Sequence, residues 1–178
     1  MRLVPIAPEL IETVAGWTAD PAVARWLDFG NGVQTLTPAA LKIMTQRPMH
    51  YLRLFMPDDA DVALGVVGFT NVDRSFKTAM PWVVLGNRTY RHASGRPPAT
   101  TVALSKLFTL GFTELGLESI YAWVVETNRA SLRLARKLNL RYIGRQRRCH
   151  WIDGTSYDRL LFDLLAEEHK ELPDDDGA

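Results

Sequence analysis

Apolar residues in the second half of this chain recur at spacings of three and four, the period of one buried helix face. The pattern runs over residues 99–115, and Gly116 follows it as a natural C-terminal cap. The sequence therefore predicts a long helix with one wide apolar face. The apolar positions are Leu104, Leu107, Phe108, Gly111, Phe112 and Leu115.

Capping residues predict shorter helices elsewhere. Asp20 and Thr37 each precede a proline. A capping side chain followed by a proline is typical of a first helical turn. We expect helices over residues 8–17, 21–28, 38–46 and 128–138.

Short, β-branched apolar runs predict strands. Asp153-Gly154 is a strong hairpin turn between the last two of them. A strand, a helix and a second strand over residues 82–125 form a crossover, so at least one strand pair should be parallel. The fold class is α/β (mixed α+β), with a mixed sheet and helices on both faces. The strands are expected over residues 50–56, 62–72, 82–85 with an extension to about Tyr90, 119–125, 142–151 and 155–164.

The length of 178 residues suits one compact domain. We expect a single domain over residues 1–166 and an acidic, disordered tail over 167–178. No apolar run reaches the roughly 18 residues of a membrane helix, and the first residues do not resemble a signal peptide. The expected location is therefore the cytoplasm, with no membrane partner. One cysteine, Cys149, excludes an internal disulfide and a multi-cysteine zinc site, and we expect no metal.

The net charge of +1 hides a basic stretch between Arg129 and Arg148. Such a stretch is typical of a nucleic-acid surface or of a site for a phosphorylated small molecule, and a solvated face explains it as well. No aromatic-rich motif of an RNA-binding module accompanies the charges, so we expect no nucleic-acid partner.

The candidate chemistry gathers between Trp82 and Leu138. Backbone N–H groups at the start of the long helix can hold a phosphate. Asn128, Ser131 and Ala135 lie at spacings of three and four, so they share one helix face. A polar edge followed by a small residue suits a ligand that lies against this helix.

With these residues the sequence resembles the GNAT acetyltransferase superfamily, and more narrowly its ribosomal-protein N-terminal acetyltransferase branch. The resemblance covers roughly residues 8–165. It implies a sheet of about seven strands, splayed near its middle, with acyl-CoA in the split between two central parallel strands. It also implies direct transfer of an acetyl group from acetyl-CoA to a primary amine, on a small molecule or a protein N-terminus. The matching segments are Ala99-Thr100, Leu115-Gly116-Leu117, residues 120–125, Asn128-Arg129-Ala130-Ser131, Lys137-Leu138, Gly144, Asp153-Gly154 and Tyr157-Asp158.

The resemblance assigns roles to individual residues. Ser131 resembles a serine proposed to protonate the leaving thiolate, although a helix serine bonded to a backbone carbonyl explains it as well. Glu126 is the first candidate for the base that deprotonates the amine, ahead of His50, Asp73 and His150, and a water chain or an already neutral amine are alternatives. Trp26 and Phe29 are expected to line the acceptor pocket. The expected cofactor-binding residues are Arg88, Thr89, Ser94, Gly95, Arg96, Ala99, Thr100, Asn128 (otherwise simply a helix cap) and Arg133.

The pyrophosphate loop departs from the family pattern. Pro97 stands where the family has glycine, and both Pro97 and Pro98 lack a backbone N–H. Losing up to two charge-assisted hydrogen bonds, each worth about 1.5–3 kcal/mol, lowers affinity by about 10²-fold or more. A second hypothesis is therefore a GNAT-fold module that binds acyl-CoA or another ligand with weak or lost catalysis. The sequence leaves open the identity of the acceptor amine and the oligomeric state, a homodimer included.

Overall fold

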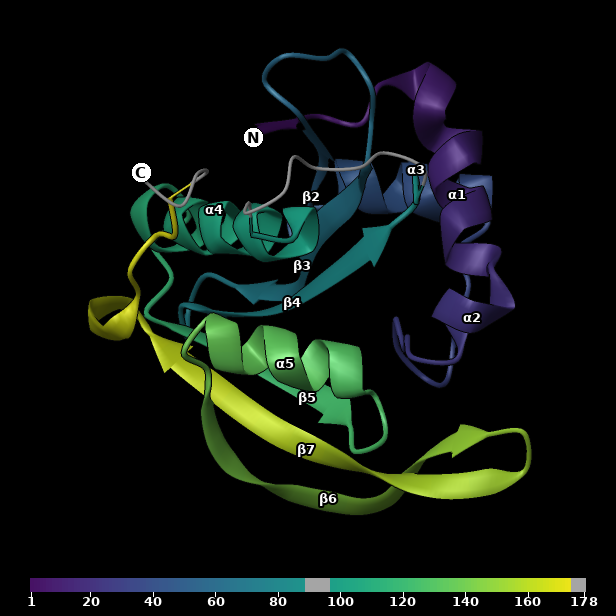
Figure 1. Ribbon diagram of the computed structural model, residues 1–178, viewed down its shortest axis with the longest axis vertical. Coiled ribbons are helices and arrows are strands. Elements are labelled where there is room, and N and C mark those ends of the chain that lie inside the picture. Colours follow the sequence, from purple (N-terminus) through teal and green to yellow (C-terminus); the bar gives the residue numbers. More distant parts are fainter. Residues whose placement is uncertain (89–96, 174–178) are drawn as a thin grey trace.

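The computed structural model describes residues 1–88 and 97–173, which form a seven-stranded sheet with helices on both faces (Figure 1). The strands lie in the order β1-β2-β3-β4-β5-β7-β6. They are β1 (Arg2–Val4), β2 (Tyr51–Met56), β3 (Gly65–Asp73), β4 (Thr78–Leu85), β5 (Ser119–Val125), β6 (Arg141–Ile152) and β7 (Thr155–Leu165). The helices are η1 (Pro8–Leu10), α1 (Ile11–Ala19), α2 (Pro21–Ala24), α3 (Pro38–Gln46), α4 (Ala99–Thr113), α5 (Arg129–Lys137) and η2 (Ala166–Glu168).

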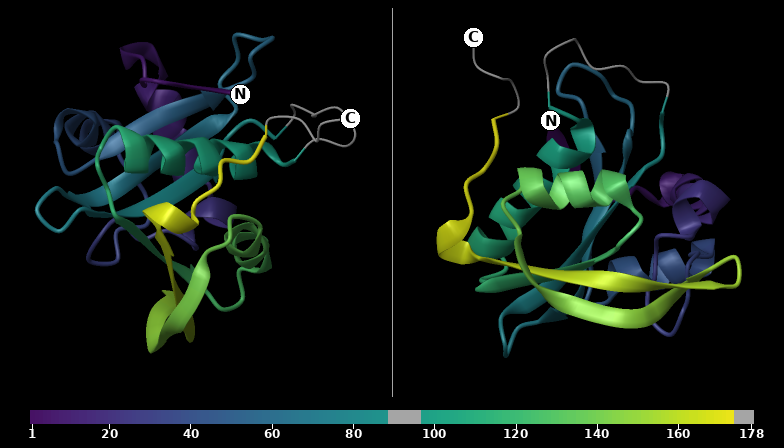
Figure 2. Two further views of the ribbon diagram at one scale, coloured as in Figure 1. Left: turned by 90° about the vertical axis from the view of Figure 1, so that its left-hand side faces the viewer. Right: turned by 60° about the horizontal axis from the view of Figure 1, so that its bottom comes forward.

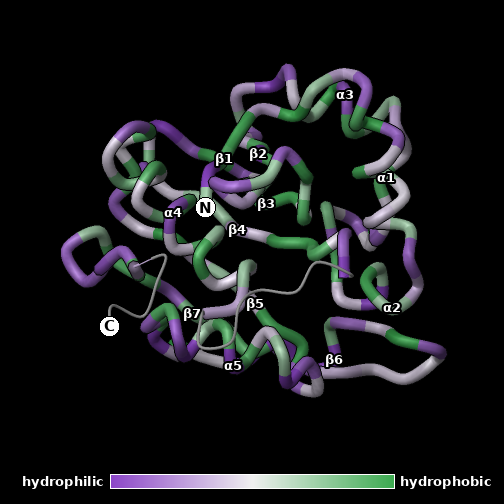
Figure 3. The backbone as a smooth tube through the Cα atoms, turned by 45° about the horizontal axis from the view of Figure 1, so that its top comes forward, coloured by the Kyte–Doolittle hydropathy of each residue, from purple (hydrophilic) through white to green (hydrophobic). Residues whose placement is uncertain are grey.

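The sheet separates two apolar cores. Successive side chains of a strand point to opposite faces, and β3 uses this alternation fully. Val66 packs in the core with α1 and α3, whereas Val67 and Phe69 pack in the core with α4. Figure 3 shows the hydrophobic stretches in the central strands between these layers. Burial on both faces makes the middle of the sheet a rigid base for the site.

The strands β4 and β5 form a parallel pair that holds only at its beginning. Thr78 pairs with Ser119 and Ala79 with Ile120, and beyond these residues the two strands part. Pro81 lies two residues past the last pair and has no N–H to donate to a neighbouring strand. The predicted mixed, splayed sheet is therefore present, and Figure 1 shows β4 and β5 diverging above and below α5.

Several predicted elements match closely, and one helix is wrong. The helix over 38–46 and the strand over 119–125 have the expected bounds. The helix expected over 21–28 ends at Ala24. The reason is Asp28, whose Oδ1 accepts hydrogen bonds from the N–H groups of Gly30 (2.8 Å) and Gly32 (3.1 Å) and so holds a turn instead. Strand β1 was not predicted, and β4 begins at Thr78 rather than at residue 82.

Within the acidic tail, which stays predicted to be disordered as a whole, residues 169–172 lie against α4 (Figure 2). The His169 ring contacts the rings of Phe108 and Phe112. The N–H of Leu172 donates to Ser105 Oγ at 2.8 Å. His169 and Leu172 lie between acidic residues in the sequence, and the acidic composition of this segment does not reveal their packing against α4. Residues 174–178 lie outside the described part of the chain. No helix within the described ranges is long and apolar enough to cross a membrane.

Candidate active site

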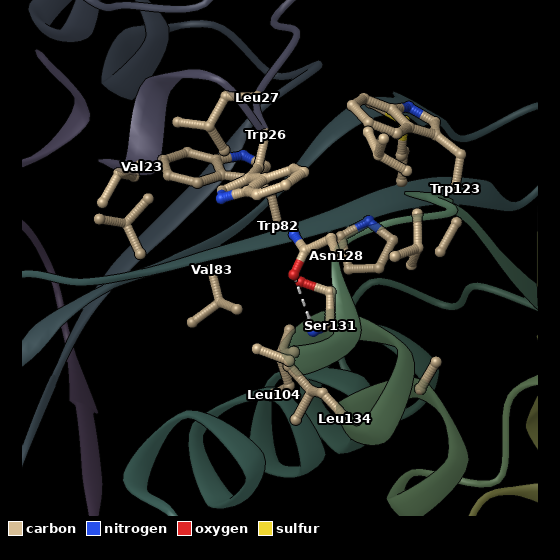
Figure 4. A pocket seen from close by; sticks show the side chains of 18 of the residues that line it. Val23, Trp26, Leu27, Trp82, Val83, Leu104, Trp123, Asn128, Ser131 and Leu134 are labelled. Carbon is tan, nitrogen blue, oxygen red and sulfur yellow. Dashed lines mark hydrogen bonds between the residues drawn. The ribbon is translucent and has the colours of Figure 1, made fainter. Parts of the chain in front are cut away.

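A cavity of about 310 Å³ lies where β4 and β5 part. Its walls come from β4, β5, the first turns of α5, the inner face of α4 and the segment that follows α2. Figure 4 shows side chains from these elements converging on the cavity. The split in the sheet therefore brings together residues far apart in sequence. The lining residues include Trp26, Asp28, Phe29, Trp82, Arg88, Leu104, Trp123, Val124, Asn128, Ser131 and Ala135.

One wall of the cavity is the first part of α5. Asn128 caps this helix, because its Oδ1 accepts a hydrogen bond from the N–H of Ser131 at 3.1 Å. Figure 4 shows the two polar side chains next to each other at the cavity. Ala135, one turn further along, also lines it and leaves room for a ligand. The predicted shared face of Asn128, Ser131 and Ala135 is confirmed, while their roles toward a ligand stay predictions.

The opposite wall is aromatic. Trp26 and Phe29 line the cavity. Trp82 and Trp123 also line it, although the sequence did not predict them as site residues. The Phe29 ring meets the Trp82 ring edge to face, with centroids 5.0 Å apart. A tryptophan within a strand is an ordinary core residue by its pattern. Only the parting of β4 and β5 leaves these two rings facing a cavity.

Behind this aromatic wall lies a polar network centred on Arg159. Its Nη2 donates to Asp28 Oδ2 (2.7 Å) and to His150 Nδ1 (3.0 Å), and its guanidinium lies over the Trp123 ring (3.9 Å to the centroid). Arginine only donates, so Nδ1 of His150 accepts, and its Nε2 carries the proton donated to the carbonyl oxygen of Arg25 (2.7 Å). The network joins the segment after α2 to β6 and β7.

The network shifts two pKa values. Burial lowers the pKa of His150, and the nearby Arg159 charge lowers it further, against the opposing effects of the Arg25 carbonyl and Asp28. Burial by itself raises the pKa of Asp28. The hydrogen bonds from Arg159, Gly30 and Gly32 outweigh burial and bring this pKa below its ordinary value. The pair is thus an ionised carboxylate beside a neutral imidazole.

Glu126, the first candidate for the base, is not among the residues lining the cavity. Its Oε1 accepts the N–H of Asp158 at 3.0 Å, and its Oε2 lies 3.7 Å from Arg145 Nη1. The carboxylate thus ties the end of β5 to β7. This placement does not favour the catalytic role, which stays a prediction. His50, Asp73 and His150 also lie outside the cavity lining.

The expected cofactor-binding residues are spread around the split. Arg88 lines the cavity and pairs with Asp20 (3.1 Å). Ala99 and Thr100 form the start of α4, behind Pro98, which caps the helix without a side-chain hydrogen bond. Arg133 is exposed on α5 and does not line the cavity. Thr89, Ser94, Gly95 and Arg96 lie outside the described residues.

The carbonyl of Pro98 accepts from the N–H groups of both Thr101 and Val102. The N–H groups of Ala99 and Thr100 therefore have no acceptor inside the helix, as at any helix start. These two amides are the groups of α4 suited to an anion. In residues 1–88 and 97–173 no three His, Cys, Asp or Glu side chains gather to hold a metal ion.

Solved structures share this fold at low sequence identity. A spermidine N-acetyltransferase from Vibrio cholerae, in complex with CoA and spermine, is similar with a TM-score of 0.78 and 12% identity over 94% of this chain and 96% of that chain. A probable acetyltransferase gives 0.73 and 18% over 93% of both chains. A GNAT-family acetyltransferase from Bacillus anthracis gives 0.69 and 18% over 93% and 95%. No curated protein matches the chain.

A family model decides membership. The model of the acetyltransferase (GNAT) domain matches residues 1–141, which is most of the chain. The matched region contains the parted strands β4 and β5, the start of α4 and the α5 wall described above. With the splayed seven-stranded sheet and the cavity in its split, this match shows that the chain belongs to the GNAT acetyltransferase family.

Proposed function

We propose that this chain is an acetyl-CoA-dependent N-acetyltransferase that acts on a primary amine. The observation that carries the proposal is the cavity between β4 and β5, with a polar helix edge on one side and an aromatic wall on the other. A donor that lies against the α5 side and an acceptor that lies against the aromatic side meet in this cavity. The similar Vibrio cholerae protein is described with CoA and spermine, which supports a CoA-linked donor and an amine acceptor as the two ligands.

The residues of the α5 wall fit an acyl-CoA arm. Leu104 and Val124 offer an apolar surface, and the small Ala135 leaves space beside them. The side-chain amide nitrogen of Asn128 stays available to donate, because the cap uses only its oxygen. The N–H groups of Ala99 and Thr100, which have no acceptor inside the helix, suit the pyrophosphate. When bound, acetyl-CoA supplies an activated thioester.

Ser131 is the proposed donor of the proton that the leaving sulfur takes up. The amine nitrogen bonds to the acetyl carbon as the carbon–sulfur bond breaks, and the sulfur leaves with the electron pair. The Ser131 hydroxyl lies on the cavity wall and can donate its proton to that sulfur. The amine releases its proton to solvent, and solvent returns a proton to the Ser131 oxygen. Water serves as the donor if Ser131 is only a helix residue.

The cavity itself favours a neutral amine. Among its described lining residues the ionisable side chains are Asp28 and Arg88, and each is already in an ion pair. An apolar surrounding lowers the pKa of an amine, because it disfavours the charged form. The acceptor therefore loses its proton on entry, without a dedicated base. Glu126 is the alternative base. Its carboxylate lies near Asp158 and does not line the cavity, so it takes the amine proton only through a water relay.

A ligand-binding module without turnover is the second candidate. The observation that favours it is the start of α4, where Pro97 and Pro98 supply no N–H to a pyrophosphate. A module of this kind binds CoA or another acyl carrier but transfers nothing. The ribosomal-protein branch, a homodimer and a cytoplasmic location stay predictions.

Two measurements test the proposal together. Calorimetry and thermal unfolding with acetyl-CoA report binding, because a ligand that binds only the folded state raises Tm. Thiol release from acetyl-CoA with a panel of amines reports transfer. Binding with amine-dependent thiol release is the expected result. Binding without release supports the module, and no binding at millimolar acetyl-CoA overturns both candidates.

A further inference from the structure

The acceptor side of the cavity carries no free charge among its described residues. Asp28 is the one carboxylate among the described lining residues, and both of its oxygens are engaged, Oδ2 by Arg159 and Oδ1 by the N–H groups of Gly30 and Gly32. The Asp28 and Arg159 side chains are each only 15% exposed, so water screens this pair little. A cationic ligand meets a carboxylate that is already neutralised.

The other ionisable side chain among the described lining residues is Arg88, and its partner is Asp20 at 3.1 Å. Both charged groups that line the described part of the cavity are therefore already in ion pairs.

Aromatic rings form most of the wall opposite α5, which is the proposed acceptor side of the cavity. Trp26, Phe29, Trp82 and Trp123 all line the cavity, on three different segments of the chain. The Phe29–Trp82 contact and the Arg159 guanidinium over Trp123 hold three of the rings in place. Rings fixed by such contacts offer a flat apolar group a preformed surface.

These features discriminate between amine classes. A polyamine carries further ammonium groups, and each one is costly to desolvate where no free carboxylate receives it. An amine on an aromatic or similarly flat apolar body has a single ammonium group, which loses its proton on entry, and it gains the burial of its body. Such burial is worth about 10- to 100-fold in affinity for a group of the size of an aromatic side chain.

Resting on the acetyltransferase function above, we propose that the acceptor is a monoamine with an aromatic or flat apolar body, in contrast to the polyamine bound by the similar Vibrio cholerae protein. The single amine lies toward Ser131 and the thioester, and the body lies between Trp26 and Trp123. Specificity then comes from the segment after α2 together with the parted strands.

The test compares three amines on the wild-type chain. Thiol release from acetyl-CoA is measured with 2-phenylethylamine, with ethylamine as the same amine without a ring, and with spermidine. The expected kcat/KM is at least about tenfold higher for 2-phenylethylamine than for either of the others. A tenfold preference for spermidine, or equal values for 2-phenylethylamine and ethylamine, overturns the proposal.

Variants locate the effect. Trp26→Ala is expected to raise KM for 2-phenylethylamine about tenfold and to leave KM for acetyl-CoA within twofold, with Trp26→Phe in between. Trp151→Ala is the matched control, because Trp151 is 63% exposed on β6 and does not line the cavity. An unchanged 2-phenylethylamine KM in folded Trp26→Ala contradicts the proposal.

Binding without turnover keeps the two proposals separate. Quenching of tryptophan fluorescence by 2-phenylethylamine reports occupancy of the aromatic wall even when no acetyl group moves. Failure of acetyl-CoA to bind in calorimetry counts against the acetyltransferase function. Normal acetyl-CoA binding, with neither quenching by nor transfer to 2-phenylethylamine, counts against the acceptor class alone.

Discussion

The two helices that flank the split in the sheet begin in different ways. Helix α5 is capped by a side chain, since Asn128 accepts from the N–H of Ser131, and its first turn faces the cavity. Helix α4 follows Pro98 without a side-chain cap, and its first turn contains the buried Ala99 and Thr101. One start is stabilised by a local hydrogen bond and the other by packing.

On the proposed function, this contrast separates two kinds of contact. The α5 start brings two polar side chains to the cavity, Ser131 as the proposed proton donor and Asn128 as a proposed contact to acetyl-CoA. The α4 start offers backbone amides, and the two prolines in front of it lack an N–H. Substitutions at the α4 start are therefore expected to act on affinity for acetyl-CoA.

The largest expected effect is at Ser131. If its hydroxyl protonates the leaving sulfur, Ser131→Ala lowers kcat by about 10²–10⁴-fold, the range of general acid catalysis. The Kd for CoA hardly changes, because the lost interaction belongs to the transition state. Steady-state kinetics and calorimetry measure the two quantities. Ser75→Ala, in the exposed turn before β4, is the control. Near-normal turnover of Ser131→Ala leaves water as the donor.

A second substitution addresses the α4 side. Pro97→Gly restores an N–H in front of the helix, and one charge-assisted hydrogen bond of about 1.5–3 kcal/mol predicts CoA binding that is about tenfold tighter or more. Calorimetry with CoA measures it. Pro48→Gly, in the exposed turn after α3, controls for the general cost of replacing a proline. Equal or weaker affinity means that the pyrophosphate is held without this amide.

Asn128→Ala is expected to act on both properties of the α5 start. Loss of the cap lowers the free energy of unfolding by about 0.5–2 kcal/mol, as measured by urea unfolding. The loss of its side-chain N–H groups raises KM for acetyl-CoA more than it lowers kcat. Thr37→Ala, which removes the cap of α3, should lower stability similarly without changing KM. Equal changes of KM in both variants refute a ligand contact by Asn128.

The smallest effect concerns pH. Burial lowers the pKa of His150 in the folded chain. Below pH about 6.5, the ordinary pKa of histidine, the unfolded chain therefore binds a proton at this residue more readily than the folded chain does. Stability is therefore highest above this pH and falls as the pH drops toward 5.5. The proton adds an N–H facing the donor Arg159. Scanning calorimetry at pH 8.0 and 5.5 should show a smaller fall of Tm in His150→Phe than in wild type.

His50 and His169 also have pKa values lowered by burial, and they titrate alike in both proteins. They therefore cancel when His150→Phe is compared with wild type. An equal fall of Tm in the two proteins contradicts the role given to His150.

Features with a local cause were predictable from the sequence. Thr37-Pro38 predicted the start of α3, and Asp153-Gly154 predicted the hairpin, in which both residues adopt positive φ. Asn139 follows the end of α5 with a φ of 57°, a left-handed conformation that asparagine tolerates at a helix end. The predicted helix end at residue 28 was wrong, because Asp28 accepts hydrogen bonds from N–H groups of the loop that follows it. Apolar spacing and capping residues do not reveal such a turn.

The sequence by itself determined the order of the main helices and strands other than β1, the helix caps, and the shared face of Asn128 and Ser131, because periodicity and capping act over a few residues. Only the tertiary structure decided that Trp82 and Trp123 face a cavity, because this depends on where two strands cease to pair. The same holds for Asp28 and Arg159, which lie 131 positions apart in the sequence and meet only when the segment after α2 packs against β7. Long-range contacts of this kind decide which charges remain free, and hence which amines the cavity favours.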